Sequence, residues 1–246
     1  MGNPLALAIS RGYMLFAAES APWVEACNAF LNSHPEMLER IQVESEKLDS
    51  DDDFWPDDDS WLSTYRPYVV SSEGILTVPI DGTLVNGVDY TIPGWMTGYG
   101  YLNRAIDRGM SDPMVRGIAL VSNSGGGDVS GNFELSDKIH AAGKQKPIQG
   151  FASDFAYSAA YSLLSAASKI TVSRTGGVGS IGVVTSHSDY SKMLDDAGIK
   201  QTLVFAGKHK VDNYSTVPLS SDAKDRIQAK IDALYDIFVN TVARNR

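Results

Sequence analysis

From Pro67 onward, hydrophobic and polar positions alternate between two periods, which predicts strands separated by helices. Short apolar runs predict strands at 74–80, 115–121, 147–152, 170–172 and 201–206. Apolar residues three and four apart predict helices at 99–108, 135–142 and 190–197, a helix after residue 154, and a long one at 222–242. Turn residues predict breaks at Asp81-Gly82 and at Ser153-Asp154. The order indicates an α/β domain with a parallel β-sheet core covered by helices.

The first 66 residues show a different pattern of apolar and charged positions. The spacing of apolar residues in 1–43 predicts a small, mostly helical N-terminal appendage. The segment Glu44–Trp61 carries nine carboxylates and one lysine, so we interpret residues 44–66 as an acidic, solvated linker. Trp55 and Trp61 within it leave open the alternative that the segment docks on a partner.

Composition narrows the function classes. The 246 residues carry a net charge of −9 with no basic cluster, which argues against a nucleic-acid surface. The single cysteine, Cys27, excludes an internal disulfide framework and suits a reducing compartment. No stretch is apolar enough to span a bilayer, and the first twenty residues lack the basic start of a secretory signal, so we expect a cytoplasmic protein.

Ser158 is the candidate nucleophile. It follows the strand predicted at 147–152 and stands near the first turn of the next helix, where free amides suit a reaction that creates an oxyanion. The alternative is structural, because Ser158, Ser162 and Ala166 recur every fourth residue and could form a close-packing seam. The sequence of this stretch alone leaves both interpretations open.

Other residues could complete a serine site. The glycines at 125–127 follow a strand and could offer backbone amides to an oxyanion, but they lack the lysine and spacing of a P-loop. A base is also needed. Lys210 could serve if its surroundings favour the neutral amine, and His187 or His209 could serve in a Ser-His-Asp arrangement. His34 and His140 look ordinary, and chemistry alone does not choose between lysine and histidine.

Four motifs taken together resemble the signal peptide peptidase A family of serine proteases, which has the Clp/crotonase superfold. They are NSGGGDVSG at 123–131, AYSAAYSLLSAASKI at 156–170, TGGVGSIGV at 175–183 and GKHK at 207–210. The resemblance is closer to the lambda-type phage capsid assembly (head maturation) proteases. It covers roughly residues 67–244, so we assign a protease domain to 67–246. Because family members continue past the long helix, we expect this chain to be a truncated or processed form.

The resemblance implies a Ser-Lys dyad. It places the nucleophile on Ser158, the general base on Lys210 and a dyad-orienting serine on Ser180. Oxyanion amides would come from Gly126 or Gly127 together with Ala159. The chain departs from the family at Gly125, where proline is usual, and at Ala159 or Ala160, where glycine is usual.

The resemblance also implies partners and a setting. It implies a homo-oligomeric ring whose sites are shared between subunits, and no cofactor, metal or nucleotide. The expected substrates are scaffold and portal-type head proteins within the assembling prohead, in the host cytoplasm. Two alternatives stay open: a catalytically idle scaffold component, and a crotonase-type acyl-CoA enzyme.

Overall fold

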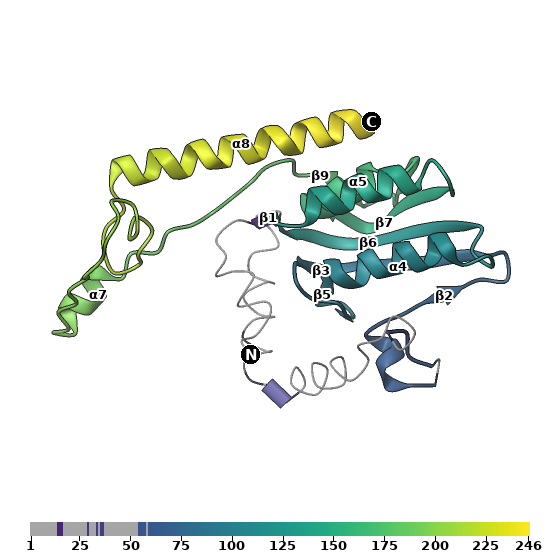
Figure 1. Cartoon of the computed structure of the whole chain (residues 1–246), viewed down its shortest axis with the longest axis horizontal. Coiled ribbons are helices and arrows are strands. Elements are labelled where there is room, and N and C mark those ends of the chain that lie inside the picture. Colours follow the sequence, from purple (N-terminus) through teal and green to yellow (C-terminus); the bar gives the residue numbers. More distant parts are fainter. Residues whose placement is uncertain (1–13, 17–28, 30–32, 34, 37–53, 58) are drawn as a thin grey trace.

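The computed structural model describes residues 14–16, 29, 33, 35–36, 54–57 and 59–246. Their central feature is a mostly parallel sheet in which the strands run in the order β4-β5-β3-β6-β7-β8. Three short strands pair at its margins, β1 with β6, β2 with β3, and β9 with β7. Figure 1 shows α4 and α5 lying along the sheet. The predicted α/β class with a parallel sheet core is therefore confirmed.

The strands are β1 Met14–Phe16, β2 Val69–Val70, β3 Ile75–Val85, β4 Thr91–Ile92, β5 Met96–Gly98, β6 Gly117–Asp128, β7 Ile148–Tyr157, β8 Lys169–Val172 and β9 Gly177–Gly179. The helices are the 3-10 helix η2 Trp61–Thr64, and α4 Tyr99–Ser111, α5 Asn132–Ala142, α6 Ala159–Ser165, α7 Ser191–Asp196 and α8 Ser221–Asn245. No helix within the described ranges is long and apolar enough to cross a membrane.

The hydrophobic core forms where strands with alternating apolar residues pack against helices that have one apolar face. In β3, Leu76, Val78 and Ile80 are buried while the residues between them are exposed or half-buried. In α4 the buried stripe includes Leu102 and Ile106, four residues apart on one face of the helix. The alternating face of the strand and the stripe of the helix thus build a single apolar layer.

The two central strands, β6 and β7, pair in parallel and then separate. Their register runs from Ile118 opposite Ile148 to Ser124 opposite Ala156. Beyond that point β6 continues to Asp128 beside β3, whereas β7 pairs with β9 and ends at Tyr157. The separation opens the sheet at its carboxyl edge, directly before Ser158.

The C-terminal part of the chain forms an arm that leaves the body. After β9 an extended segment leads to α7, and α8 then returns (Figure 1). Only the far end of α8 is anchored firmly to the body. There the ring centroids of Phe238 and Phe133 lie 5.9 Å apart, and Asn245 Nδ2 donates to Ser165 Oγ at 2.9 Å. The predicted helix at 222–242 is thus confirmed and slightly longer.

Two predicted breaks in the strands are absent, and the glycines expected to follow a strand lie within it. Asp81-Gly82 lies inside β3, where a register shift and the positive φ of Gly82 (64°) make an irregularity of the strand rather than a turn. The glycines at 125–127 belong to β6, and Ser153-Asp154 lies inside β7. In each case pairing with neighbouring strands outweighs the local preference for a turn.

The strand predicted at 201–206 is wrong. These residues are irregular, and the side chain of Val204 is 94% exposed. A strand needs a partner for its backbone hydrogen bonds, and none of the strands in the described part of the chain pairs with this segment. High β propensity alone did not produce a strand here.

The division at residues 43 and 66 stays a prediction, since most of 1–53 lies outside the described residues. Within them, residues 29, 33, 35 and 36 are helical and Met14–Phe16 form a strand. The described end of the acidic segment differs from a solvated linker. Phe54 is buried, and the guanidinium groups of Arg66 and Arg104 lie 4.1 and 4.3 Å from its ring centroid.

We predict that Phe54→Ala destabilises the protein by about 3 kcal/mol, because it empties a buried site between two guanidinium groups. Urea unfolding followed by circular dichroism measures the change. Met114→Ala is the control, since that side chain is 72% exposed and its loss should change stability by less than about 0.5 kcal/mol. Equal midpoints for the two variants would show that the acidic segment does not pack on the domain.

Candidate active site

Ser158 occupies the turn between β7 and α6 in a backbone conformation that side chains rarely adopt. Its φ is 54° and its ψ is −118°, which costs about 1–3 kcal/mol for a residue with a Cβ. Its amide donates to the carbonyl of Gly179 at 2.7 Å, which fixes the turn to the end of β9. Such a strained strand-to-helix turn is typical of nucleophile positions.

The side chain of Ser158 is buried, and its hydroxyl makes no hydrogen bond within the described residues. The residue is 1% exposed. A buried hydroxyl without a partner costs free energy, so such groups tend to have a functional reason. Ser162 and Ala166 are buried on the same helix side, so the packing seam is present as well. The two interpretations of this stretch are compatible.

Ser180 lies next to Ser158. Tyr157 and Gly179 are paired in the β7–β9 ladder, so the two serines directly follow a paired position on neighbouring strands. Ser180 has a φ of 55°, and these two serines are the non-glycine residues with positive φ in the described part of the chain. Sequence reasoning placed both serines in the site, and the structure brings them together.

The glycine backbone of β6 forms the opposite side. Gly127 has no room for a side chain, because a Cβ there would lie 2.0 Å from the Leu84 carbonyl oxygen. Gly126 has a φ of 112°, and its amide donates to Ser124 Oγ at 3.2 Å. An oxyanion at Gly126 would therefore have to replace that hydroxyl, whereas Ala159 stands at the start of α6, directly after Ser158.

A polar clamp that the sequence did not reveal ties the two sides together. Asn132 Nδ2 donates to the Ala159 carbonyl and to the Tyr99 hydroxyl, both at 3.0 Å. The Tyr99 hydroxyl in turn donates to the Asp128 carbonyl at 2.7 Å. Burial raises the pKa of Tyr99 well above its ordinary value, so the hydroxyl keeps its proton. We call Asn132 and Tyr99 the buried clamp; no spacing or composition signal distinguishes either residue in advance.

Lys210 does not lie at this site within one chain. It is exposed in the turns between α7 and α8, and Figure 1 shows that loop at the far end of the arm, away from β7 and β9. Both arm histidines are there too. His187 Nδ1 is 3.0 Å from Asn213 Oδ1, and His209 Nδ1 is 3.1 Å from Asp212 Oδ2. The structure thus unites Ser158, Ser180 and the oxyanion candidates but leaves every candidate base on the arm.

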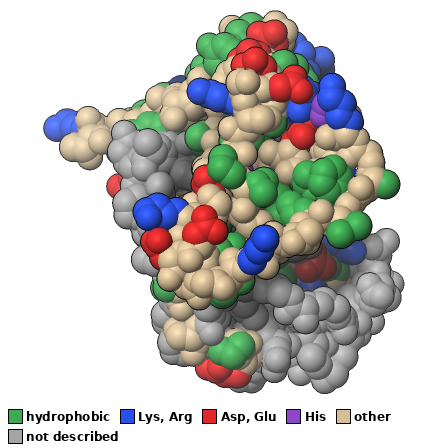
Figure 2. Space-filling model, turned by 90° about the vertical axis from the view of Figure 1, so that its left-hand side faces the viewer, with side chains coloured by type: hydrophobic (Ala, Val, Ile, Leu, Met, Phe, Trp, Pro, Cys, Tyr) green, Lys and Arg blue, Asp and Glu red, His purple; other side chains and the backbone are tan. Residues whose placement is uncertain are grey.

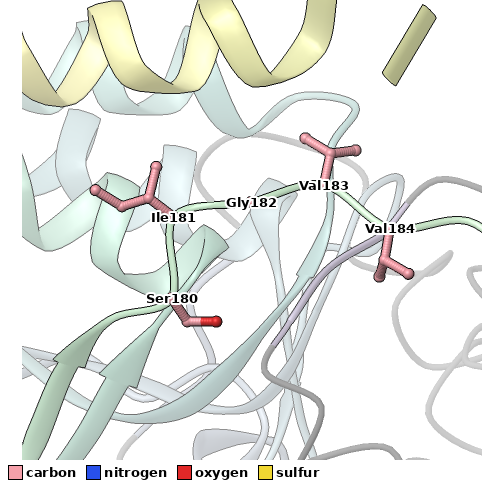
Figure 3. Close-up of a pocket in the computed structure, with 5 residues that line it drawn as sticks. All are labelled: Ser180, Ile181, Gly182, Val183 and Val184. Atoms are coloured by element: carbon pink, nitrogen blue, oxygen red, sulfur yellow. The ribbon is translucent and has the colours of Figure 1, made fainter. Parts of the chain in front are cut away.

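A shallow hollow of about 220 Å³ begins at Ser180. Its lining is the extended segment Ser180–Val184 (Figure 3). Ile181 and Val183 point to one side of the segment and Val184 to the other. An extended, half-apolar backbone beside the serine pair suits contact with another peptide segment. Among the described residues, no group of three or more His, Cys, Asp or Glu is placed to hold a metal ion.

Comparison with known proteins gives a consistent result. Residues 140–246 match the model of Peptidase family S49. The head-tail preconnector protein GP5 of Enterobacteria phage P21 is 38% identical over 171 residues, covering 69% of this chain and 34% of that protein. Capsid assembly protease C of Escherichia phage lambda is 37% identical over 187 residues, covering 76% and 42%. The chain thus spans less than half the length of these two curated relatives.

A structural comparison aligns the chain with the crystal structure of an enoyl-CoA hydratase/isomerase-type protein from Acinetobacter baumannii. The TM-score is 0.35 at 12% identity, covering 70% of this chain and 95% of the other. A similarity at this level carries no argument about activity.

We predict that Tyr99→Phe and Asn132→Leu each destabilise the protein by about 1–3 kcal/mol, because each leaves buried polar groups without a partner. Since the two side chains share one hydrogen bond, the double variant should lose less than the sum. A double-mutant cycle by urea unfolding measures the coupling, expected at about 0.5 kcal/mol or more. Strict additivity would mean that the clamp does not act as a unit.

Proposed function

Because the chain is related to the serine peptidases of family S49, we propose that it is a serine endopeptidase that uses a Ser158–Lys210 dyad during phage capsid maturation. The observation that carries the proposal is the state of Ser158, a buried, unpartnered hydroxyl on a strained strand-to-helix turn. The end of β6, with its glycine backbone, and the start of α6 lie beside it.

The proposed reaction follows from these groups. The neutral amine of Lys210 takes the proton of Ser158 Oγ, and the oxygen attacks a peptide carbonyl carbon. Amides of Gly126 or Gly127 and of Ala159 would stabilise the oxyanion. The peptide C–N bond breaks as the ammonium returns its proton to the leaving amine. Water, deprotonated by the same amine, then hydrolyses the acyl-enzyme. Ser180 would orient the amine.

The position of Lys210 supports a shared site. In one chain the loop that carries it lies far from Ser158 (Figure 1), so a second copy would have to supply the amine. Figure 2 shows hydrophobic side chains gathered on the face that the arm presents. Exposed apolar residues of the arm include Met193, Ile199, Val204 and Phe205. Such a patch is typical of an interface, and here it suits other copies of the chain in a homo-oligomeric ring.

The names of the similar proteins suggest the process in which this chain would act. One of them is named a capsid assembly protease and the other a head-tail preconnector protein. We therefore infer that this chain acts on scaffold and portal-type proteins of an assembling phage head inside the host cell. A catalytically idle scaffold component is the competing function, and the exposed, distant Lys210 is the observation in its favour.

We predict that Ser158→Ala and Lys210→Ala each abolish cleavage of an unfolded protein substrate, and that mixing the two under subunit exchange restores activity. Restoration is expected because one site can then combine the Ser158 of one copy with the Lys210 of another. Random exchange should return up to about a quarter of the parent rate, since each site draws its serine and its lysine independently.

Lys208→Ala is the matched control for this experiment, because Lys208 is a neighbouring exposed lysine outside the proposed dyad. It should cut at close to the parent rate. Full activity in Lys210→Ala would refute the dyad. An inactive parent that assembles normally would favour the scaffold component instead.

We predict that replacing Val204 and Phe205 by glutamate weakens self-association at least about tenfold, because charges would be buried in an apolar contact. Sedimentation velocity measures the assembly, and peptidase activity should fall with it. Met114→Glu is the control, being a comparably exposed apolar residue on the body. An unchanged assembly in the arm variant would remove the arm from the interface.

A further inference from the structure

The short strand β1 pairs with the glycine end of β6. The two run antiparallel, with Met14 opposite Asp128, Leu15 opposite Gly127 and Phe16 opposite Gly126. Figure 1 shows β1 at the end of β6 nearest the arm. A segment more than a hundred residues away in sequence therefore reaches the backbone on which the proposed oxyanion amides lie.

The edge of β6 that β1 occupies follows from the sheet. A strand has two edges, and β3 holds one of them at the same residues, with Thr83 opposite Gly126 and Leu84 opposite Gly127. β1 must therefore pair along the other edge. That is the edge which β7 occupies up to Ser124 and then leaves.

The candidate active site lies where these two strands separate. β7 turns away from β6 after Ala156 and runs directly into Ser158. The segment Ser180–Val184 follows β9, the next strand along, and β1 is the purple strand that passes behind it in Figure 3. A peptide cleaved by Ser158 would have to place its carbonyl between Ser158 and the end of β6.

Each edge of a β-strand can pair with only one neighbouring strand at a time. An extended substrate would gain affinity by adding a strand to a free sheet edge. The β6 edge at Gly126–Asp128 cannot pair with β1 and with a substrate strand at once, because one strand edge has room for one neighbouring strand. Only three residues of β1 pair, so its hold is modest and reversible.

We propose that Met14–Phe16 is a self-inhibitory strand, an intramolecular occupant of the substrate edge of β6 that a protein substrate must displace. The inference rests on the proposed function for its consequence, but the occupancy of the edge can be measured without catalysis. The attachment of β1 to the same chain favours it over free peptides, because a tethered segment has an effective concentration of about a millimolar.

The test uses Leu15→Pro in the full-length chain, with Leu15→Ala as the matched control. Proline removes the backbone amide and disfavours strand pairing, whereas alanine keeps the amide. Both are made in a Ser158→Ala background, which cannot cut. A fluorescent peptide from an unfolded substrate should bind about tenfold more tightly to Leu15→Pro than to Leu15→Ala, as loss of one or two hydrogen bonds predicts.

Hydrogen exchange gives a second readout. Amides of the segment 125–129 should exchange faster in Leu15→Pro than in Leu15→Ala, because the β1 side of β6 is uncovered. A peptide of residues 12–18, added in trans to Leu15→Pro, should restore the protection and compete with the substrate peptide, and a scrambled peptide should do neither. Phe16→Pro repeats the test if Leu15→Pro unfolds.

The outcomes separate the two proposals. Unchanged peptide affinity and unchanged exchange in both proline variants would overturn the self-inhibitory strand, whatever the activity of the parent. Faster exchange without tighter peptide binding would overturn it too. If binding and exchange change as expected but the parent with Ser158 cuts no substrate, the strand stands and the proposed peptidase function fails.

Discussion

A backbone hydrogen bond from the Ser158 amide to the Gly179 carbonyl ties the turn on which the proposed chemistry depends to the end of β9. The turn is unfavourable for serine, so the surrounding structure has to offset its cost. Burial of Ala159, Ala160 and Leu163 against the sheet does so from the helix side. Pairing of β7 with β9 does so from the strand side. Small residues suit the start of α6, because Ala159 and Ala160 are fully buried and a larger side chain at either would push the helix, and with it Ser158, away from the sheet.

β6 and β7 separate before Ser158, and the buried clamp links the elements on the two sides of that separation. Asn132 reaches Ala159 on one side, and through Tyr99 it reaches Asp128 on the other. An oxyanion site needs its amides fixed before the reaction, since reorganisation would cost part of the stabilisation. Buried hydrogen bonds in a region of low dielectric provide that rigidity better than apolar contacts, which tolerate small shifts. The clamp is thus a positioning element rather than a reacting one.

Periodicity predicted the strands and helices wherever apolar side chains alone decide the structure, as in Leu76, Val78 and Ile80 of β3. Prediction from periodicity failed where backbone pairing between strands, rather than burial of side chains, determines the structure. Glycines have low β propensity, so Gly125–Gly127 looked like a loop, yet β3 supplies the pairing that keeps them in β6. The apolar residues around Val204 looked like a strand, yet nothing in the described chain pairs with them.

The residues of the candidate site also divide into those that could be predicted from the sequence and those that could not. Ser158 could be proposed as a candidate from its position after a predicted strand, whereas the choice of Ser158 as nucleophile and the role of Ser180 came from the resemblance to the signal peptide peptidase A family. Asn132 could not, because a buried asparagine is defined only by the three elements that it joins. β1 could not either, since its pairing depends on which edge of β6 remains free.

The two proposed restraints on activity act on different quantities. With Lys210 on the arm as the base, the rate would depend on subunit concentration, because a chain far from its neighbours would have no amine at Ser158. With β1 on the β6 edge, the rate would also depend on the substrate, because only a segment that pairs better than the three residues of β1 would gain entry. Assembly would therefore decide whether the enzyme is active at all, and β1 would decide which segments it accepts. In the proposed setting, the inside of an assembling phage head, the concentrations of subunits and substrates would both be high, so both restraints would be relieved in the same place.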